Sequence, residues 1–138
     1  MPGVKTYAIF GFCILDNFND STEVLQTEIM SYVNLVAEIT HSMVDRYGGS
    51  ANKNIGDAFL LVWKFHNPKQ IQAMDEAGKF ESSKISLHNQ VIADVSVFSF
   101  LKIIAKLNKY KHILKYNDNE EMRRRIPDFK VEMGFGLH

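Results

Sequence analysis

The stretch from Tyr47 to Trp63 constrains the fold more than any other part of this 138-residue chain. Gly48-Gly49 follows a run of helical periodicity, and Gly56-Asp57 then precedes a nearly all-apolar segment. Glycine ends helices and forms tight turns because it adopts positive φ without a steric penalty. The stretch therefore predicts a helix end followed by a β-hairpin whose tip carries the Asp57 carboxylate.

Apolar patterning before this hairpin predicts a strand and a long helix. Residues 7–15 carry no charge and are rich in aromatic and β-branched side chains, which is typical of a buried strand. We expect the helix to begin at an N-cap among Asp20, Ser21 and Thr22 and to run for about six turns. Its apolar stripe comprises Leu25, Ile29, Val33, Val36, Ile39, Met43 and Tyr47.

The second half of the chain predicts an insertion, a helix and a strand. Residues 64–90 lack periodicity, so we expect an insertion there with a helical turn near 71–77. Residues 91–116 predict the second helix, and residues 118–125 a charged connection. Residues 129–138 alternate as a strand. Its apolar face comprises Phe129, Val131, Met133 and Phe135.

The element order is therefore strand, helix, strand, strand, helix, strand. This βαββαβ order predicts an α+β, ferredoxin-like fold with two helices on one face of an antiparallel sheet. In such a fold the end of the first strand and the hairpin tip lie close together. The length fits one domain spanning residues 1–138.

Charge and cysteine usage exclude several classes of protein. Sixteen basic and sixteen acidic residues balance, so no net field favours a nucleic acid. A single cysteine, Cys13, excludes a disulfide framework. With no apolar stretch long enough to span a membrane and no signal peptide, we expect a cytoplasmic chain, or the cytosolic part of a larger or membrane-bound protein. The five histidines, His41, His66, His88, His112 and His138, do not have metal-ligand spacing.

Three blocks of the sequence resemble the class III nucleotidyl cyclases, which are the adenylate and guanylate cyclase catalytic domains. They are residues 10–20 (FGFCILDNFND), the helix end 44–49 (VDRYGG) running into 53–59 (KNIGDAF), and residues 129–138 (FKVEMGFGLH). The resemblance covers nearly the whole chain but about the first two thirds of a cyclase domain. We therefore expect a truncated domain that lacks the family's last strands and final helix.

The resemblance implies a metal-assisted reaction. In this family two aspartates hold two divalent cations, Mg²⁺ or Mn²⁺, which promote attack of the ribose 3′-hydroxyl on the α-phosphorus and release of pyrophosphate. Asp57 matches the second of these aspartates, and Gly56 lies beside it in the substrate-binding turn. From the residues alone, the Gly56-Asp57 pair also fits an ordinary β-turn.

Lys53 matches the family position that recognises the purine. A lysine there implies ATP rather than GTP, because an ammonium group only donates hydrogen bonds and so suits N1 of adenine but not the N1–H of guanine. A solvated lysine at a strand edge is the alternative interpretation.

The chain also departs from the family pattern. Ile14 stands where the first metal-binding aspartate is expected, and isoleucine cannot bind a cation. Asp16 lies two residues further on, about 6–7 Å along an extended strand, and fits a strand-ending turn better than a substitute metal ligand. The family's late transition-state Asn and Arg, and its second purine contact, have no counterpart, so we expect the chain alone to be inactive.

The sequence therefore predicts an adenylate-cyclase-like homology domain of cyclic-nucleotide signalling that pairs, as a homodimer or heterodimer, with another cyclase domain. The alternative is a non-catalytic regulatory or dimerisation module that pairs with a complete cyclase chain. A ferredoxin-like RNA-binding domain is a third interpretation. It is disfavoured because the chain lacks a net basic charge and an exposed aromatic pair on its central strands.

Overall fold

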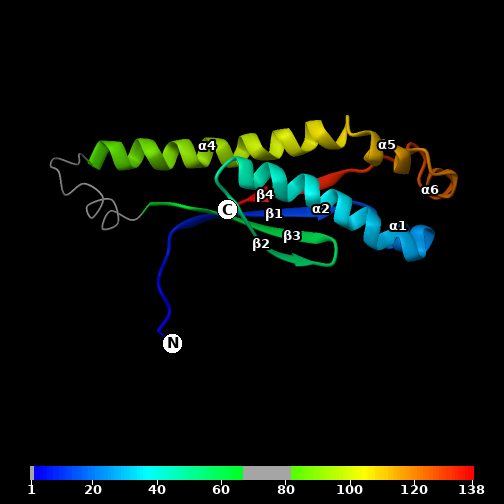
Figure 1. The fold of residues 1–138 in the computed structure, drawn as a ribbon, viewed down its shortest axis with the longest axis horizontal. Coiled ribbons are helices and arrows are strands. Elements are labelled where there is room, and N and C mark those ends of the chain that lie inside the picture. Colours follow the sequence, from blue (N-terminus) through cyan, green and yellow to red (C-terminus); the bar gives the residue numbers. More distant parts are fainter. Residues whose placement is uncertain (1, 67–81) are drawn as a thin grey trace.

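The computed structural model describes residues 2–66 and 82–138, and these contain a four-stranded antiparallel sheet with helices packed on it (Figure 1). The strands are β1 (Ala8–Leu15), β2 (Ser50–Ile55), β3 (Ala58–Lys64) and β4 (Met133–Leu137), in the order β2-β3-β1-β4. The predicted α+β fold is confirmed, and β1 lies at the centre between the hairpin and β4.

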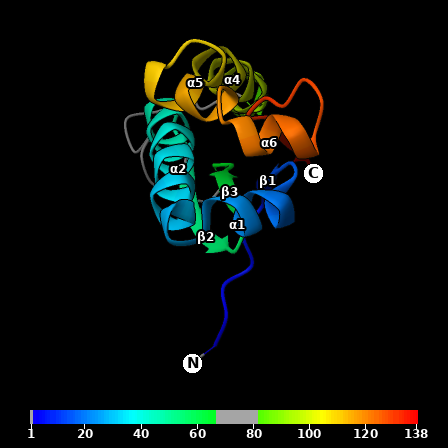
Figure 2. The ribbon, with the colours of Figure 1, turned by 90° about the vertical axis from the view of Figure 1, so that its right-hand side faces the viewer.

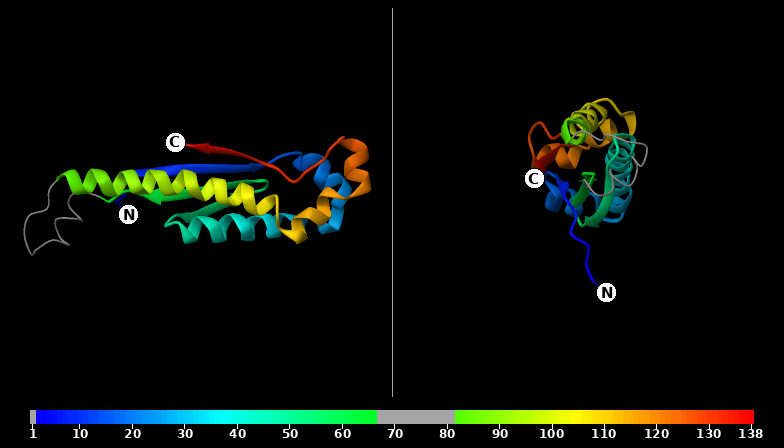
Figure 3. Two further views of the ribbon diagram at one scale, coloured as in Figure 1. Left: turned by 90° about the horizontal axis from the view of Figure 1, so that it is seen from above. Right: turned by 90° about the vertical axis from the view of Figure 1, so that its left-hand side faces the viewer.

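Two long helices cover one face of this sheet. The helical segments are α1 (Phe18–Leu25), the 3₁₀ turn η1 (Gln26–Glu28), α2 (Ile29–Arg46), α4 (Ser82–Leu107), α5 (Lys111–Asn117) and α6 (Glu120–Arg125). Helices α2 and α4 lie side by side over the sheet, and the end view of Figure 2 shows both on the same side of the strands. Figure 3 shows α5 and α6 at the end of the molecule where α1 lies. Of the described helices, none has the length and apolarity that a membrane crossing needs.

The core lies between the sheet and these two helices. On β1, Gly11, Cys13 and Leu15 face inward and are buried. The largest fully buried side chain is Trp63 on β3, whose ring lies edge-on to Phe100 of α4 with centroids 5.8 Å apart. The other buried apolar residues of the helices include Tyr32, Val36, Ile39 and Val44 of α2 and Ile103 and Leu107 of α4.

The prediction that the first strand is buried holds for only one of its faces. Phe10, Phe12 and Ile14 point away from the core and are 43–48% exposed. The expectation that the central strands carry no exposed aromatic pair is therefore wrong, because Phe10 and Phe12 form one on β1. The long helices cover only the other face of the described sheet, so a strand that is apolar at every position leaves half of its side chains uncovered.

The first helix differs from the prediction at its start and in its continuity. It begins at Phe18, after Asn17 in the left-handed region (φ 54°), so none of Asp20, Ser21 and Thr22 is the N-cap. Asparagine tolerates this conformation, which lets the chain leave β1 and enter a helix within two residues. A second positive φ, 47° at Gln26, then separates α1 from α2.

The second helix starts earlier and ends sooner than expected. It begins at Ser82, so residues 82–90 of the predicted insertion are helical. Residues 67–81, with the helical turn expected near 71–77, lie outside the described residues. The helix ends at Leu107 because Tyr110 is extended, and α5 follows as a separate element.

The predicted charged connection contains helix α6. Its N-cap is Asn119, whose side-chain Oδ1 accepts a hydrogen bond from the Met122 backbone N–H at 3.0 Å. Beyond α6, the buried faces of Phe129 and Val131 confirm the predicted alternation, although β4 itself begins only at Met133. The Val131 N–H donates to the Asn117 side chain at 2.8 Å rather than to a neighbouring strand.

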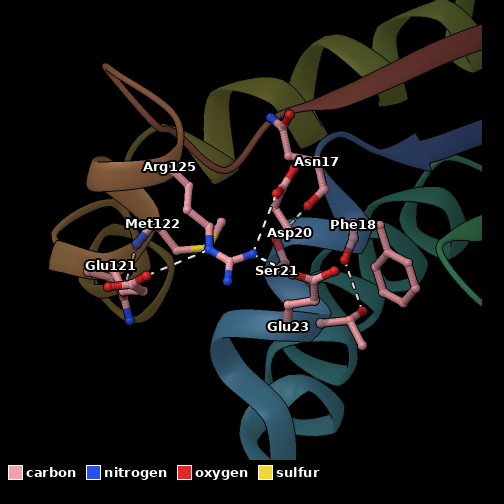
Figure 4. A network of polar contacts seen from close by, with 10 residues as sticks. Asn17, Phe18, Asp20, Ser21, Glu23, Glu121, Met122 and Arg125 are labelled. Carbon is pink, nitrogen blue, oxygen red and sulfur yellow. Dashed lines mark hydrogen bonds and ion pairs between the residues drawn. The ribbon is translucent and has the colours of Figure 1, made fainter.

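Arg125 joins α6 to α1 at the end of the molecule (Figure 4). Its guanidinium donates to Glu23 at 2.5 Å and lies 3.8 Å from Asp20 and 3.6 Å from Glu121. The hydrogen bond to Glu23 raises the pKa of Arg125. These contacts connect the helix that follows β1 to the helix that precedes β4.

Candidate functional site

The β2-β3 hairpin has a two-residue turn formed by Gly56 and Asp57. Ile55 pairs with Ala58 across it, and Gly56 has φ 59°. A positive φ at the first central residue is the geometry that favours glycine in hairpin turns. Asp57 is half-buried and lies at the tip, as the sequence predicts.

This tip lies beside the end of β1. The Leu15 N–H donates to the Asp57 carbonyl oxygen at 3.0 Å, and Ile14 pairs with Ala58. The expected closeness of the first strand's end and the hairpin tip is therefore confirmed. The contact is made by the backbone, so it positions Asp57 whatever side chains β1 carries.

Lys53 lies on the face of the sheet opposite the long helices. In the antiparallel ladder Lys53 pairs with Leu60, and Leu60 pairs with Phe12. Residues directly opposite each other project to the same face, so these three form one row across the sheet. Since Phe12 is 48% exposed on the open face, Lys53 belongs to that face too.

Ile14 belongs to the next row of the same face. It pairs with Ala58 on one side and with Gly134 on the other, and it is 48% exposed. The structure thus brings Lys53, Ile14 and the Asp57 turn together around one corner of the open face.

This corner does not fit a two-aspartate metal centre. The β1 position beside Asp57 carries the alkyl side chain of Ile14, which has no donor atom for a hard cation. Within residues 2–66 and 82–138 there is no group of three or more His, Cys, Asp or Glu side chains that could hold a metal ion. One carboxylate, that of Asp57, remains where the resemblance implies two.

Asp16 does not fill this gap. Its N–H donates to the Glu132 carbonyl oxygen at 3.0 Å, on the β4 side of β1. It lines a cavity of about 220 Å³ with Ile104 and Leu107 of α4. The Asp57 turn is on the β3 side, so Asp16 ends the strand on the side away from the candidate site.

Cys13 is adjacent to Ile14 in the chain but faces the core. Burial raises the pKa of its thiol to about 12. A thiol with this pKa stays protonated at neutral pH and is a poor nucleophile. Cysteine chemistry therefore has no part in this site.

No protein-family model and no curated protein matches the sequence. Solved structures do match. A bacterial light-regulated adenylyl cyclase is 21% identical with a TM-score of 0.62, and the match covers 96% of this chain and 52% of that one. The chain has the fold of a nucleotidyl cyclase domain.

Guanylyl cyclase domains match to a similar degree. The guanylate cyclase domain of RhGC from Catenaria anguillulae, solved in complex with GTP, is 19% identical with a TM-score of 0.59 and covers 97% of this chain and 57% of that one. A dimeric guanylyl cyclase domain of the RhoGC fusion protein from Blastocladiella emersonii is 18% identical with a TM-score of 0.58, and covers 97% and 58%. The cyclase fold is thus common to both substrate classes, and this chain spans about half the length of these matched structures.

Sequence reasoning missed the open apolar face around the site. Phe10 and Phe12 give no alternation that would separate an exposed face from a buried one. Only the placement of both long helices on the opposite side reveals it.

Proposed function

We propose that this chain is a nucleotidyl cyclase homology domain that pairs with a second cyclase domain and is not catalytic by itself. The observation that carries this proposal is the position of Ile14 beside the Asp57 turn on the open face of a cyclase fold. Family chemistry at this position requires a carboxylate. Loss of one such electrostatic element typically costs orders of magnitude in rate.

We propose ATP as the nucleotide that the composite site binds. Lys53 supports this choice because it lies on the open face in the row next to Ile14, and its ammonium group can donate to N1 of adenine. GTP is the competing ligand, since the fold is shared with guanylyl cyclases.

The open face supports a protein partner. Phe10, Phe12 and Ile14 are each more than 40% exposed on one strand, next to the candidate site. Exposed apolar groups of this kind mark interaction surfaces. A second copy or another cyclase domain can bury them and bring its own carboxylates to the site.

A regulatory dimerisation module is the second candidate function. The same exposed apolar face favours it, because dimerisation through this face needs neither Lys53 nor Asp57. The two candidates differ in whether Lys53 matters once the partner is bound.

The deciding experiment is a complementation assay. We expect the purified chain with ATP and Mg²⁺ or Mn²⁺ to form no cyclic AMP above the blank. Added to a complete cyclase chain whose own purine-recognising residue has been substituted, it should restore activity, and Lys53→Ala should lower the restored rate at least tenfold. Lys111→Ala, at an exposed position of α5 outside the sheet, is the matched control and should have no effect.

Two results would contradict the proposal. Cyclic AMP formation by the chain alone, abolished by Asp57→Ala, would show that it is a complete enzyme. A restored rate that is indifferent to Lys53→Ala would favour the regulatory module instead.

A further inference from the structure

A basic cavity lies between the C-terminal part of α2 and the last turns of α4, on the helical side of the molecule. Its volume is about 340 Å³. It is lined by four cationic side chains, Arg46, Lys102, Lys106 and Lys109, and by the half-buried Met43 and Tyr47. None of the described residues that line it carries a carboxylate, and the core separates it from the open face that carries Lys53.

Among the described residues, 2–66 and 82–138, the four cations have no ion-pair partner. Arg46 is in the last turn of α2 and Lys106 in the last turn of α4, where each helix dipole contributes a charge of about −0.5. The described residues that line the cavity therefore leave it with a net positive charge.

Aromatic contacts orient this cluster. Tyr47 at the end of α2 packs edge-on against Phe98 of α4, with ring centroids 5.3 Å apart, and so joins the two walls of the cavity. The Lys102 ammonium lies 5.1 Å from the Phe98 ring centroid, and the Lys106 ammonium 5.5 Å from that of Tyr110. Cation–π contacts of this kind restrict flexible lysine side chains and leave their N–H groups free to donate.

We propose that this cavity binds a compact, multiply charged phosphate anion. The cavity is open to solvent, and its volume of about 340 Å³ leaves room for two or three linked phosphates. A di- or triphosphate carries enough negative charge to match the cluster, and its oxygens accept hydrogen bonds from Lys and Arg. The anion is either a free polyphosphate or the phosphorylated headgroup of a lipid, since both present the same chemistry.

The first test is a calorimetric titration of the 138-residue chain with inorganic pyrophosphate at constant ionic strength. We expect saturable binding that weakens roughly tenfold in the double variant Lys102→Gln/Lys106→Gln, because two exposed charge pairs are lost. The matched control is Lys111→Gln/Lys115→Gln on α5, which removes the same charge from exposed positions that do not line the cavity. The control should bind like the unmodified chain.

Vesicles distinguish the two sources of phosphate. Flotation with phosphatidylcholine vesicles, with and without a phosphoinositide, tests the lipid headgroup. Pyrophosphate binding alone assigns a free anion, and phosphoinositide-dependent flotation that is lost in the Lys102/Lys106 variant assigns a headgroup.

The proposal is overturned if neither probe binds, or if both double variants weaken binding equally. If the cations only neutralise two helix ends, the Lys102/Lys106 variant should melt at a lower temperature than the control variant, and added anion should not change the difference between them.

Discussion

At the scale of single residues, Ile14 decides what the candidate site can do. Its backbone lies next to the Asp57 turn, at the position where the cyclase resemblance implies a carboxylate and this chain carries an alkyl side chain. Because Ile14 is about half exposed, its side chain contributes little to the core. A polar replacement here should therefore be tolerated by the fold.

Ile14→Asp should create a divalent-cation site. The new carboxylate would lie beside the turn that carries Asp57, and two carboxylates bind Mn²⁺ far better than one. We expect Mn²⁺ affinity, measured by calorimetry, to rise at least tenfold. Phe10→Asp places a carboxylate on the same face of the same strand, four residues away, and is the matched control. Equal Mn²⁺ affinities in the two variants would contradict the assignment of this corner as the position of a metal site.

Cys13 predicts a pH dependence of stability. Burial raises its pKa from 9.0 to about 12 in the folded state, so between these values the folded chain keeps a proton that the unfolded chain loses. The contribution of Cys13 to the free energy of unfolding should therefore be fully present below pH 9. Above pH 9 the free energy of unfolding should fall by up to about 1.4 kcal/mol per pH unit.

Urea unfolding of Cys13→Ala measured at pH 8 and pH 10 checks this. The variant should lose stability at both values but show a smaller decrease between them than the unmodified chain. Tyr32, whose pKa burial also raises to about 12 from 10.0, is retained in both proteins and cancels in the comparison. Parallel decreases in the two proteins would contradict the effect.

At the scale of elements, the glycine pair after α2 fixes how the hairpin leaves the helix. Gly48 has φ 76°, the left-handed conformation of a helix C-cap, as the sequence predicts. Gly49 is required for a different reason. A Cβ there would lie 2.6 Å from two atoms of the Trp63 indole and 2.7 Å from Val44. The chain must pass closely over the tryptophan to bring β2 alongside β3.

Gly49→Ala should therefore destabilise the fold. Overpacking of a tight contact typically costs about 1–3 kcal/mol, and Trp63 is buried on β3 with little freedom to move. Gly136→Ala, in β4 with no atom within 4 Å of its added Cβ, is the control and should leave the free energy of unfolding nearly unchanged. Urea unfolding of both variants measures the difference, and similar stabilities would show that the contact with Trp63 relaxes freely.

At the scale of the whole molecule, the sheet has one covered and one open face. Helices α2 and α4 bury Cys13, Leu15 and Trp63 on one side, while the other exposes an apolar surface that includes the candidate site. A second chain bound to this surface would contact the candidate site around Lys53 and Asp57, so the function of the site would depend on dimer formation.

Phe12→Glu should weaken this association. Phe12 lies in the middle of the open face, so a buried glutamate would oppose any partner that covers it. We expect sedimentation velocity to show concentration-dependent association of the chain, or of the chain with a cyclase partner, reduced at least tenfold in the variant. Met30→Glu on α2, 63% exposed, is the control. Loss of association in the control but not in Phe12→Glu would place the interface on the helical side.

Sequence by itself determined the order of the elements, the glycine-ended helix, the Gly56-Asp57 hairpin and the resemblance to cyclases, because each depends on local backbone preference or short-range pattern. It did not determine that the first helix begins at Phe18 and is interrupted at Gln26, because glutamine rarely adopts a positive φ and no local preference announces one there. Nor did it reveal which half of β1 is exposed. A strand that is apolar at every position has the same pattern on both faces, so its sequence does not indicate which face the helices cover. Only the tertiary structure places Lys53, Ile14 and the Asp57 turn around one corner of the uncovered face.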